Sequence, residues 1–238
     1  MDKHHALILQ HLVREYINTG QPVGSRLLSG TIRISASPAT IRSRLRSLEQ
    51  DGYLEQPHTS AGRLPTDQGY RYFVDQQLHS FRPSARKLSE LARRLHIIRT
   101  DHPHLERAAT HLLASLCQAI AVTGWLPSHQ VQEAGLADLC TSEDSVDHNT
   151  LRELSFLLKH VDVHLPELAA LSQNHTHVFI GRENPIGNAR YTSFMTRAAN
   201  LPNGQQAVFM LIGPKRMPYQ RNADILDNLA QLFEYNRL

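Results

Sequence analysis

The stretch that decides the fold is SPATIRSRLRSLEQDGYLEQPHTSAGRLPT, residues 37–66. Ser37 and Pro38 supply a helix N-cap and a proline at the first helical position. Three apolar residues follow at the spacing of one helix face, namely Ile41, Leu45 and Leu48. The pattern stops at Gly52, so the stretch predicts a helix from Pro38 to about Gln50 with one buried face.

The elements on either side of this helix predict a winged helix-turn-helix. Residues 7–17 have helical periodicity that ends at Gly20, and Ser25 can cap a short helix. After the central helix, residues 53–56 and 63–64 predict two short strands around a turn-rich loop. Three helices followed by a strand, a loop and a strand are the order of a winged helix.

The second part of the chain predicts a mixed domain. Pro83 and Ser84 mark a boundary, because one breaks a helix and the other can cap the next. The predicted helices are 85–98, about 105–122, 151–163, 166–171 and 219–234. The predicted strands are HVFIG, ARYTSFMTRA and QQAVFMLIG, residues 177–181, 189–198 and 205–213. The fold class is α+β with a small antiparallel sheet, divided into residues 1–80, a linker helix at 81–104, and a domain at 105–238.

Composition is that of a folded, soluble protein. Apolar residues make up 41% of the 238 residues and charged residues 20%. A net charge of +3 is too small by itself to imply a nucleic-acid partner, although arginines cluster at residues 24–66 and 81–107. Cys117 and Cys140 lack a C-x-x-C spacing and favour the reducing cytosol. No apolar run approaches the roughly 18 residues of a membrane span.

The predicted helix at 38–50 has a basic and hydroxylic outer face. Once its apolar residues turn inward, Thr40, Arg42, Ser43, Arg44 and Arg46 are left for the remaining surface. Guanidinium groups can pair with guanine edges in a major groove, and the helix N-terminus can receive a phosphate. The alternatives are a solvated helix face and a winged helix that binds protein.

The other candidate sites are weaker. His160 with His164, and His175 with His177, have metal-compatible spacings but lack further ligands, so no metal is predicted. The sequence has no G-x-G-x-x-G, P-loop or G-x-S-x-G motif, and neither a cofactor nor an enzymatic activity is predicted.

Several segments together resemble the heat-inducible transcription repressor HrcA family. They are PVGSRLLS, SPATIRSRLRSLEQDGYLEQPHTSAGRLPTDQGYRYFVD, IGRENP and IGPKRMPYQR. The resemblance is close over residues 5–78 and weaker over residues 105–238. It implies a winged helix followed by a reduced GAF-like regulatory and dimerisation domain, in a cytoplasmic, nucleoid-associated protein.

The resemblance also implies a function and its partners. A homodimer is expected to bind an inverted-repeat operator, the CIRCE element, and to repress chaperone operons, with the chaperonin GroEL keeping the repressor active. The residues expected to bind DNA are Ser25, Arg26, Ser37, Thr40, Arg42, Ser43, Arg44, Arg46, His58, Thr59, Ser60 and Arg63. Arg63 is expected to enter a minor groove.

Two features depart from the family pattern. Typical members have Asn-Asp where this helix has Ser43-Arg44, which leaves the operator sequence open. They also carry an inserted dimerisation domain within the GAF-like part, whereas AVTGWLPSHQVQEAGLADL passes almost directly to the later segment. The alternative function is a ligand-responsive winged-helix regulator with an effector pocket in the C-terminal domain; a metal-dependent enzyme built on the histidines is the third hypothesis.

Overall fold

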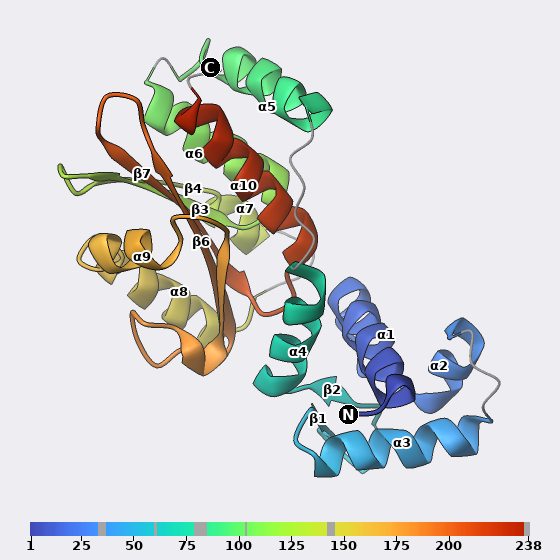
Figure 1. The fold of residues 1–238 in the computed structure, drawn as a ribbon. Coiled ribbons are helices and arrows are strands. Elements are labelled where there is room, and N and C mark those ends of the chain that lie inside the picture. Colours follow the sequence, from blue (N-terminus) through green and yellow to red (C-terminus); the bar gives the residue numbers. More distant parts are fainter. Residues whose placement is uncertain (33–36, 60, 79–84, 103, 142–145, 236–238) are drawn as a thin grey trace. The chain divides into compact units, whose positions relative to one another are not determined.

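A computed structural model describes residues 1–32, 37–59, 61–78, 85–102, 104–141 and 146–235 (Figure 1). The predicted boundary at residues 81–84 lies outside the described residues. The chain divides into two compact units, residues 1–80 and 81–238. None of the helices in the described ranges is long and apolar enough to cross a membrane.

The first unit is a winged helix, as the sequence predicts. Its elements are α1 (Lys3–Thr19), α2 (Ser25–Thr31), α3 (Pro38–Gln50), β1 (Leu54–Glu55), β2 (Leu64–Pro65) and α4 (Asp67–Leu78). The strands β1 and β2 pair antiparallel, with Leu54 opposite Pro65. Buried side chains of α1, α2, α3 and α4 form the core, including Leu12, Leu28, Leu48 and Phe73.

The second unit is built around one sheet. Its helices are α5 (Ala85–Ile98), α6 (Leu105–Cys117), α7 (Leu136–Thr141), α8 (His148–His160), α9 (Leu165–Leu171) and α10 (Tyr219–Glu234), with a 3₁₀ turn η1 (Gly181–Glu183). Its strands are β3 (Ile120–Leu126), β4 (Gln130–Ala134), β5 (His177–Ile180), β6 (Thr192–Asn200) and β7 (Gln206–Pro214).

The sheet is antiparallel with the order β4-β3-β7-β6-β5. Helices α6 and α10 cover one face, and α8 and α9 cover the other (Figure 1). The strands β6 and β7 are buried along almost their whole length because both faces of the sheet are covered. The predicted fold class, a winged helix followed by a GAF-like α/β domain with a small antiparallel sheet, is confirmed.

One predicted helix was too long. The sequence predicted a helix over residues 105–122, but α6 ends at Cys117, where Gln118 adopts a left-handed conformation with φ 51°. The next residues form the hairpin of β3 and β4, which the sequence pattern did not indicate. A strand that is buried on both faces carries a continuous apolar run, and such a run is indistinguishable by periodicity from the buried part of a helix.

Two other boundaries differ from the prediction. Helix α8 begins three residues earlier than predicted, at His148, because the Asp147 carboxylate accepts hydrogen bonds from the backbone N–H groups of Asn149 and Thr150. The strand β6 starts at Thr192 rather than 189. The final helix has the predicted bounds.

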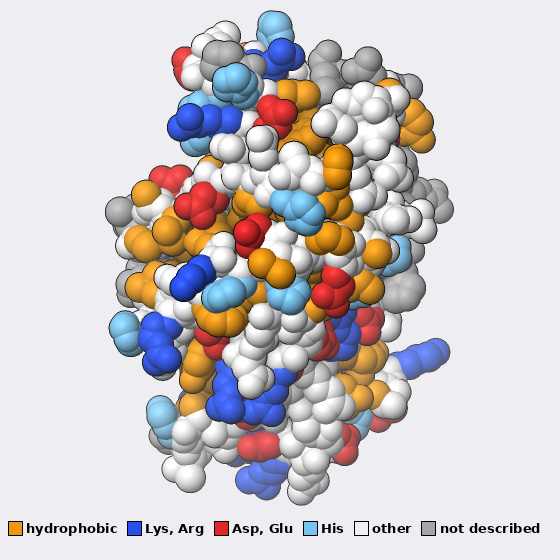
Figure 2. Space-filling model, turned by 90° about the vertical axis from the view of Figure 1, so that its left-hand side faces the viewer, with side chains coloured by type: hydrophobic (Ala, Val, Ile, Leu, Met, Phe, Trp, Pro, Cys, Tyr) orange, Lys and Arg blue, Asp and Glu red, His pale blue; other side chains and the backbone are white. Residues whose placement is uncertain are grey.

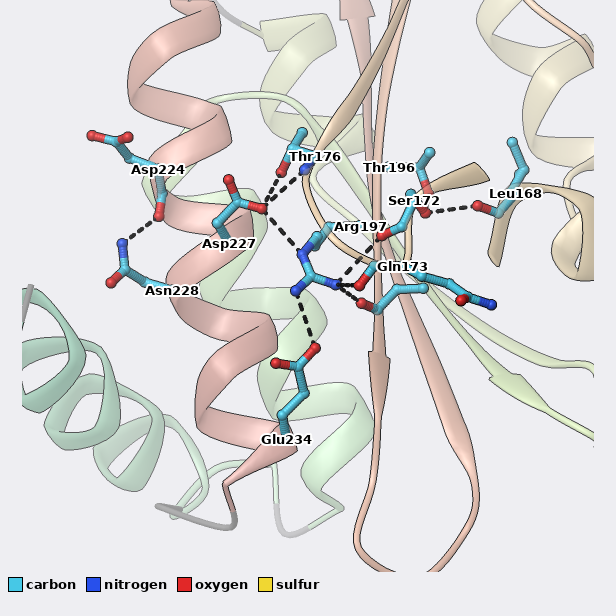
Figure 3. A network of polar contacts seen from close by, with 11 residues as sticks. Leu168, Ser172, Gln173, Thr176, Thr196, Arg197, Asp224, Asp227, Asn228 and Glu234 are labelled. Carbon is cyan, nitrogen blue, oxygen red and sulfur yellow. Dashed lines mark hydrogen bonds and ion pairs between the residues drawn. The ribbon is translucent and has the colours of Figure 1, made fainter. Parts of the chain in front are cut away.

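A buried polar cluster joins α10 to the sheet (Figure 3). Arg197 on β6 is 5% exposed, and its Nε donates to Asp227 Oδ1 at 3.1 Å. Its Nη2 donates to Glu234 Oε1 at 3.0 Å and its Nη1 to the Gln173 carbonyl oxygen at 2.7 Å. The backbone and hydroxyl of Thr176 also donate to Asp227, at 3.0 and 2.9 Å. The cluster therefore satisfies the buried guanidinium from several elements at once.

Candidate nucleic-acid interface

The helix α3 begins at Pro38, directly after its N-cap residue Ser37. Ser37 Oγ accepts a hydrogen bond from the Thr40 backbone N–H at 3.1 Å, and Pro38 occupies the first turn. Three apolar side chains of α3 are buried, namely Ile41, Leu45 and Leu48. This burial fixes the rotation of the helix and leaves the opposite side for solvent or a ligand.

Most of the predicted α3 residues lie on that outer side. Thr40, Arg42, Ser43 and Arg46 are exposed, as is Ser37 at the cap. On the neighbouring helix α2, Arg26 is exposed and Ser25 is half-buried. In the described residues, the guanidinium groups of the exposed arginines Arg26, Arg42 and Arg46 have no ion-pair partner.

A groove of about 520 Å³ brings these residues together with the wing. It lies between the start of α2, the outer side of α3 and the loop that joins β1 to β2. Six of the predicted residues line it, namely Ser25, Arg26, Arg42, Arg46, Thr59 and Arg63. The lining in the described part of the chain contains four arginines and no acidic residue, so the groove favours an anionic ligand.

The loop between β1 and β2 is held by a side chain that the sequence prediction missed. Gln56 Nε2 donates to the carbonyl oxygens of Thr59 and Ala61, each at 2.9 Å. His58 and Thr59 are exposed at this loop, while the predicted Ser60 lies outside the described residues. Gln56 thus holds the two sides of the loop together, and the loop residues His58 and Thr59 face solvent.

Gly62 brings the wing against the turn that precedes α2. A Cβ at this position would lie 2.6 Å from backbone atoms of Pro22 and Val23, closer than any real contact. Next to it, Arg63 and Val23 exchange two backbone hydrogen bonds of 2.9 and 3.0 Å. Only glycine permits this approach, which places the wing beside α2.

Arg63 is the predicted residue whose surroundings differ most from expectation. Its Nε lies 2.9 Å from Glu49 Oε2, and its side chain is only 13% exposed. Glu49 belongs to the last turn of α3, so the ion pair ties the wing to the helix. The minor-groove role of Arg63 stays a prediction. In this structure the arginine holds the wing against α3 through its ion pair with Glu49.

Arg44 turns towards the first helix. Its Nη1 lies 3.7 Å from Asp2 Oδ1, and its side chain is 27% exposed. The Asp2 carboxylate also caps α1, accepting from the backbone N–H groups of His4 and His5 at 2.8 Å each. Hydrogen bonds from the His5 backbone and side chain, with a smaller contribution from His4, lower the pKa of Asp2 to about 2. Asp2 is therefore ionised at neutral pH and attracts Arg44, whose base-reading role stays a prediction.

The histidine pairs have local partners. His160 Nδ1 lies 2.8 Å from the Phe156 carbonyl oxygen, and His164 Nδ1 lies 3.4 Å from Glu167 Oε2. The His177 ring packs on Phe179, with centroids 4.5 Å apart. Across the described ranges, no three His, Cys, Asp or Glu side chains are placed to hold a metal ion.

Comparison with known proteins places the chain in a family. A profile described as the HrcA protein C terminal domain matches residues 76–222. The chain belongs to the HrcA family. The match covers most of the second unit, including all the strands of its sheet.

Individual HrcA proteins also match parts of this chain. The heat-inducible transcription repressor HrcA of Desulforamulus reducens is 53% identical over 75 residues, which are 32% of this chain and 22% of that protein. The protein of the same name from Moorella thermoacetica is 37% identical over 137 residues, 58% of this chain and 36% of that one. The matched part is thus well under half of either relative.

One solved structure has the same fold. A hypothetical protein with a crystal structure at 2.2 Å resolution superposes with a TM-score of 0.77 and 18% identity. The superposition covers 99% of this chain and 98% of the other. At this identity the likeness concerns the fold alone.

Proposed function

We propose that this HrcA-family chain is a sequence-specific, DNA-binding transcriptional repressor of heat-shock chaperone operons. The observation that carries the proposal is the groove in which Arg26, Arg42 and Arg46, all exposed and unpaired among the described residues, meet the wing. The relatives named heat-inducible transcription repressor supply the biological context.

The groove has the chemistry that a DNA backbone requires. Guanidinium groups bind phosphate oxygens through charge-assisted, often bidentate hydrogen bonds. The exposed hydroxyls of Thr40 and Ser43 lie on the same helix and can contact base edges or phosphates. In this proposal the arginines of the groove position the duplex, and the outer side of α3 enters the major groove.

The operator is proposed to be an inverted repeat of the CIRCE type, bound by a homodimer. One winged helix presents one reading helix, and a two-fold operator needs two such helices related by the same symmetry. Residues 1–80 are proposed to bind DNA, residues 81–104 to form a linker helix, and residues 105–238 to serve regulation and dimerisation. The linker helix α5 packs on α6 and α10 within the second unit. Such a repressor would act in the cytoplasm, at the nucleoid.

The test is the salt dependence and sequence dependence of binding by the full chain. Fluorescence anisotropy with a labelled inverted-repeat duplex should give an affinity that falls steeply with salt. Arg42→Ala should weaken binding by about 1–3 kcal/mol if it reads a base, or lower the salt slope by about one if it binds phosphate. Arg99→Ala is the matched control, an exposed arginine in the second unit, and should change nothing. Equal affinity for the operator and a scrambled duplex would refute sequence-specific repression.

The chaperonin GroEL is proposed as the partner that keeps the repressor active. Adding GroEL to the same binding assay should raise the fraction of chain that binds the operator, and an unfolded competitor protein should reverse the gain. If the fraction of chain that binds the operator is the same with and without GroEL, chaperonin control is excluded while the DNA-binding proposal still stands.

A further inference from the structure

A second hollow lies in the second unit, and none of the residues assigned to DNA lines it. It has a volume of about 730 Å³ and lies between α8 and the segment 187–191 that leads into β6. This volume is within the range of small-molecule sites, about 300–1,000 Å³. Figure 2 looks onto the side that carries α8 and α9, where hydrophobic side chains are exposed among basic, acidic and histidine side chains.

The rim of this hollow is cationic. Three basic or imidazole side chains and one carboxylate line it, namely His148, Arg152, Arg190 and Glu153. Arg152 and Arg190 are exposed, and neither guanidinium has an ion-pair partner among the residues that the structure describes. Two unpaired guanidiniums at one pocket favour a carboxylate or another anion.

The single acid in the lining is occupied by the protein itself. Glu153 Oε1 accepts from the Arg190 backbone N–H at 2.7 Å, and Oε2 accepts from the Tyr191 backbone N–H at 2.9 Å and from the Thr192 hydroxyl at 3.1 Å. These three hydrogen bonds direct the carboxylate towards the backbone of the segment. They also order that segment against α8, so the positions of its lining residues are set before any ligand arrives.

The walls offer aromatic surface. The side chains of Phe156 and Tyr191 line the hollow and are 48% and 45% exposed, which is high for large hydrophobic residues. Gly187 lets the segment 187–191 pack closely against the Phe156 ring, because a Cβ at Gly187 would lie 2.5 Å from Phe156 Cε1. Phe156 also packs on the His160 ring, with centroids 4.3 Å apart. The part of the Phe156 side chain that stays exposed, together with Tyr191, suits a flat ring that carries an anionic group beside the cations.

We propose that this pocket binds a small aromatic carboxylate. The carboxylate pairs with Arg152 and Arg190, and the ring lies against Phe156 and Tyr191. The binding event involves only the second unit, so it stands or falls independently of the proposed DNA function.

The test uses 4-hydroxybenzoate as the probe and 4-hydroxybenzamide as its uncharged counterpart, each titrated into the full chain by isothermal titration calorimetry. The acid should bind saturably and about tenfold or more tightly than the amide, because only the acid can form charge-assisted hydrogen bonds. Arg152→Ala and Arg190→Ala should each raise the Kd of the acid by about tenfold.

Lys159→Ala is the matched control, since Lys159 is an exposed cation on α8 that does not line the hollow. It should change the Kd by less than about twofold, as a distant screened charge does. Gly187→Ala should abolish binding of the acid by displacing Phe156, and thermal melts would show whether each variant is folded. The proposal is overturned if the acid gives no saturable binding, if acid and amide bind alike, or if Lys159→Ala weakens binding as much as Arg152→Ala.

Discussion

At the scale of single residues, Arg63 shows how one ion pair changes the role of a side chain. On the sequence it is a free cation at the end of a wing, whereas in the fold it is 13% exposed and paired with Glu49. A cation held in this way loses part of its attraction for phosphate and gains a positioning role. The unpaired arginines Arg42 and Arg46 are the better candidates for direct contact with DNA.

Glu49→Gln separates the two roles of Arg63. The substitution removes a negative charge near the groove, so a purely electrostatic model expects tighter DNA binding. If the ion pair positions the wing, affinity should instead fall, by about 1 kcal/mol, with little change in salt slope. Operator titrations at several salt concentrations measure both quantities.

Glu55→Gln is the control for this experiment, because Glu55 is an exposed acid of β1 with no ion pair among the described residues. Glu55→Gln changes the charge of the first unit by the same amount but leaves the ion pair between Arg63 and Glu49 intact. Tighter binding by both variants to the same extent would dismiss the positioning role.

At the scale of elements, the second unit depends on a polar connection inside its core. The Arg197 guanidinium joins β6 to α10 through Asp227 and Glu234 (Figure 3). Burial raises the pKa of Asp227, while the Thr176 hydroxyl and the charge of Arg197 act in the opposite direction. Removing only the cation would leave two acids without their partner.

Arg197→Met should destabilise the second unit by about 3–5 kcal/mol, because it leaves a buried carboxylate uncompensated. The double variant Arg197→Met with Asp227→Leu should recover part of this loss, since it removes the buried charge as well. Urea unfolding followed by circular dichroism measures both free energies. The explanation is contradicted if adding Asp227→Leu to Arg197→Met lowers the free energy of unfolding further, by as much as an independent core substitution would.

At the scale of the whole molecule, packing gives the two cysteine thiols different environments, which the sequence alone does not distinguish. Cys117 is buried at the end of α6, and Cys140 is exposed on α7. Burial raises the pKa of Cys117 from 9.0 to about 12. The raised pKa keeps the Cys117 thiol protonated in the native protein, and a protonated thiol is a weaker nucleophile than a thiolate.

A thiol-specific reagent should therefore label Cys140 alone in the native chain and both cysteines after unfolding, as mass spectrometry of the peptides would show.

The raised pKa of Cys117 also makes stability depend on pH. The unfolded chain loses this proton near pH 9, while the folded chain keeps it until about pH 12. The stabilising contribution is complete below pH 9 and is lost as pH rises through this window. Cys117→Ala should flatten this part of the pH profile, whereas Cys140→Ala should not; rapid native labelling of Cys117 would contradict its burial.

The sequence by itself determined the elements whose signals are local. The Ser37-Pro38 start of α3, its apolar face and the two strands around a turn-rich loop were predictable, because caps, periodicity and turns act over a few neighbouring residues. The basic outer face of α3 followed from the same periodicity.

Only the tertiary structure decided which groups meet. It turned the apolar run after Cys117 into β3, because a strand covered on both faces has no alternating pattern to detect. It paired Arg63 with Glu49 and brought α8 beside the segment 187–191 to form a second pocket. These contacts join residues far apart in the chain, and their energies depend on burial and direction, which a linear pattern does not contain.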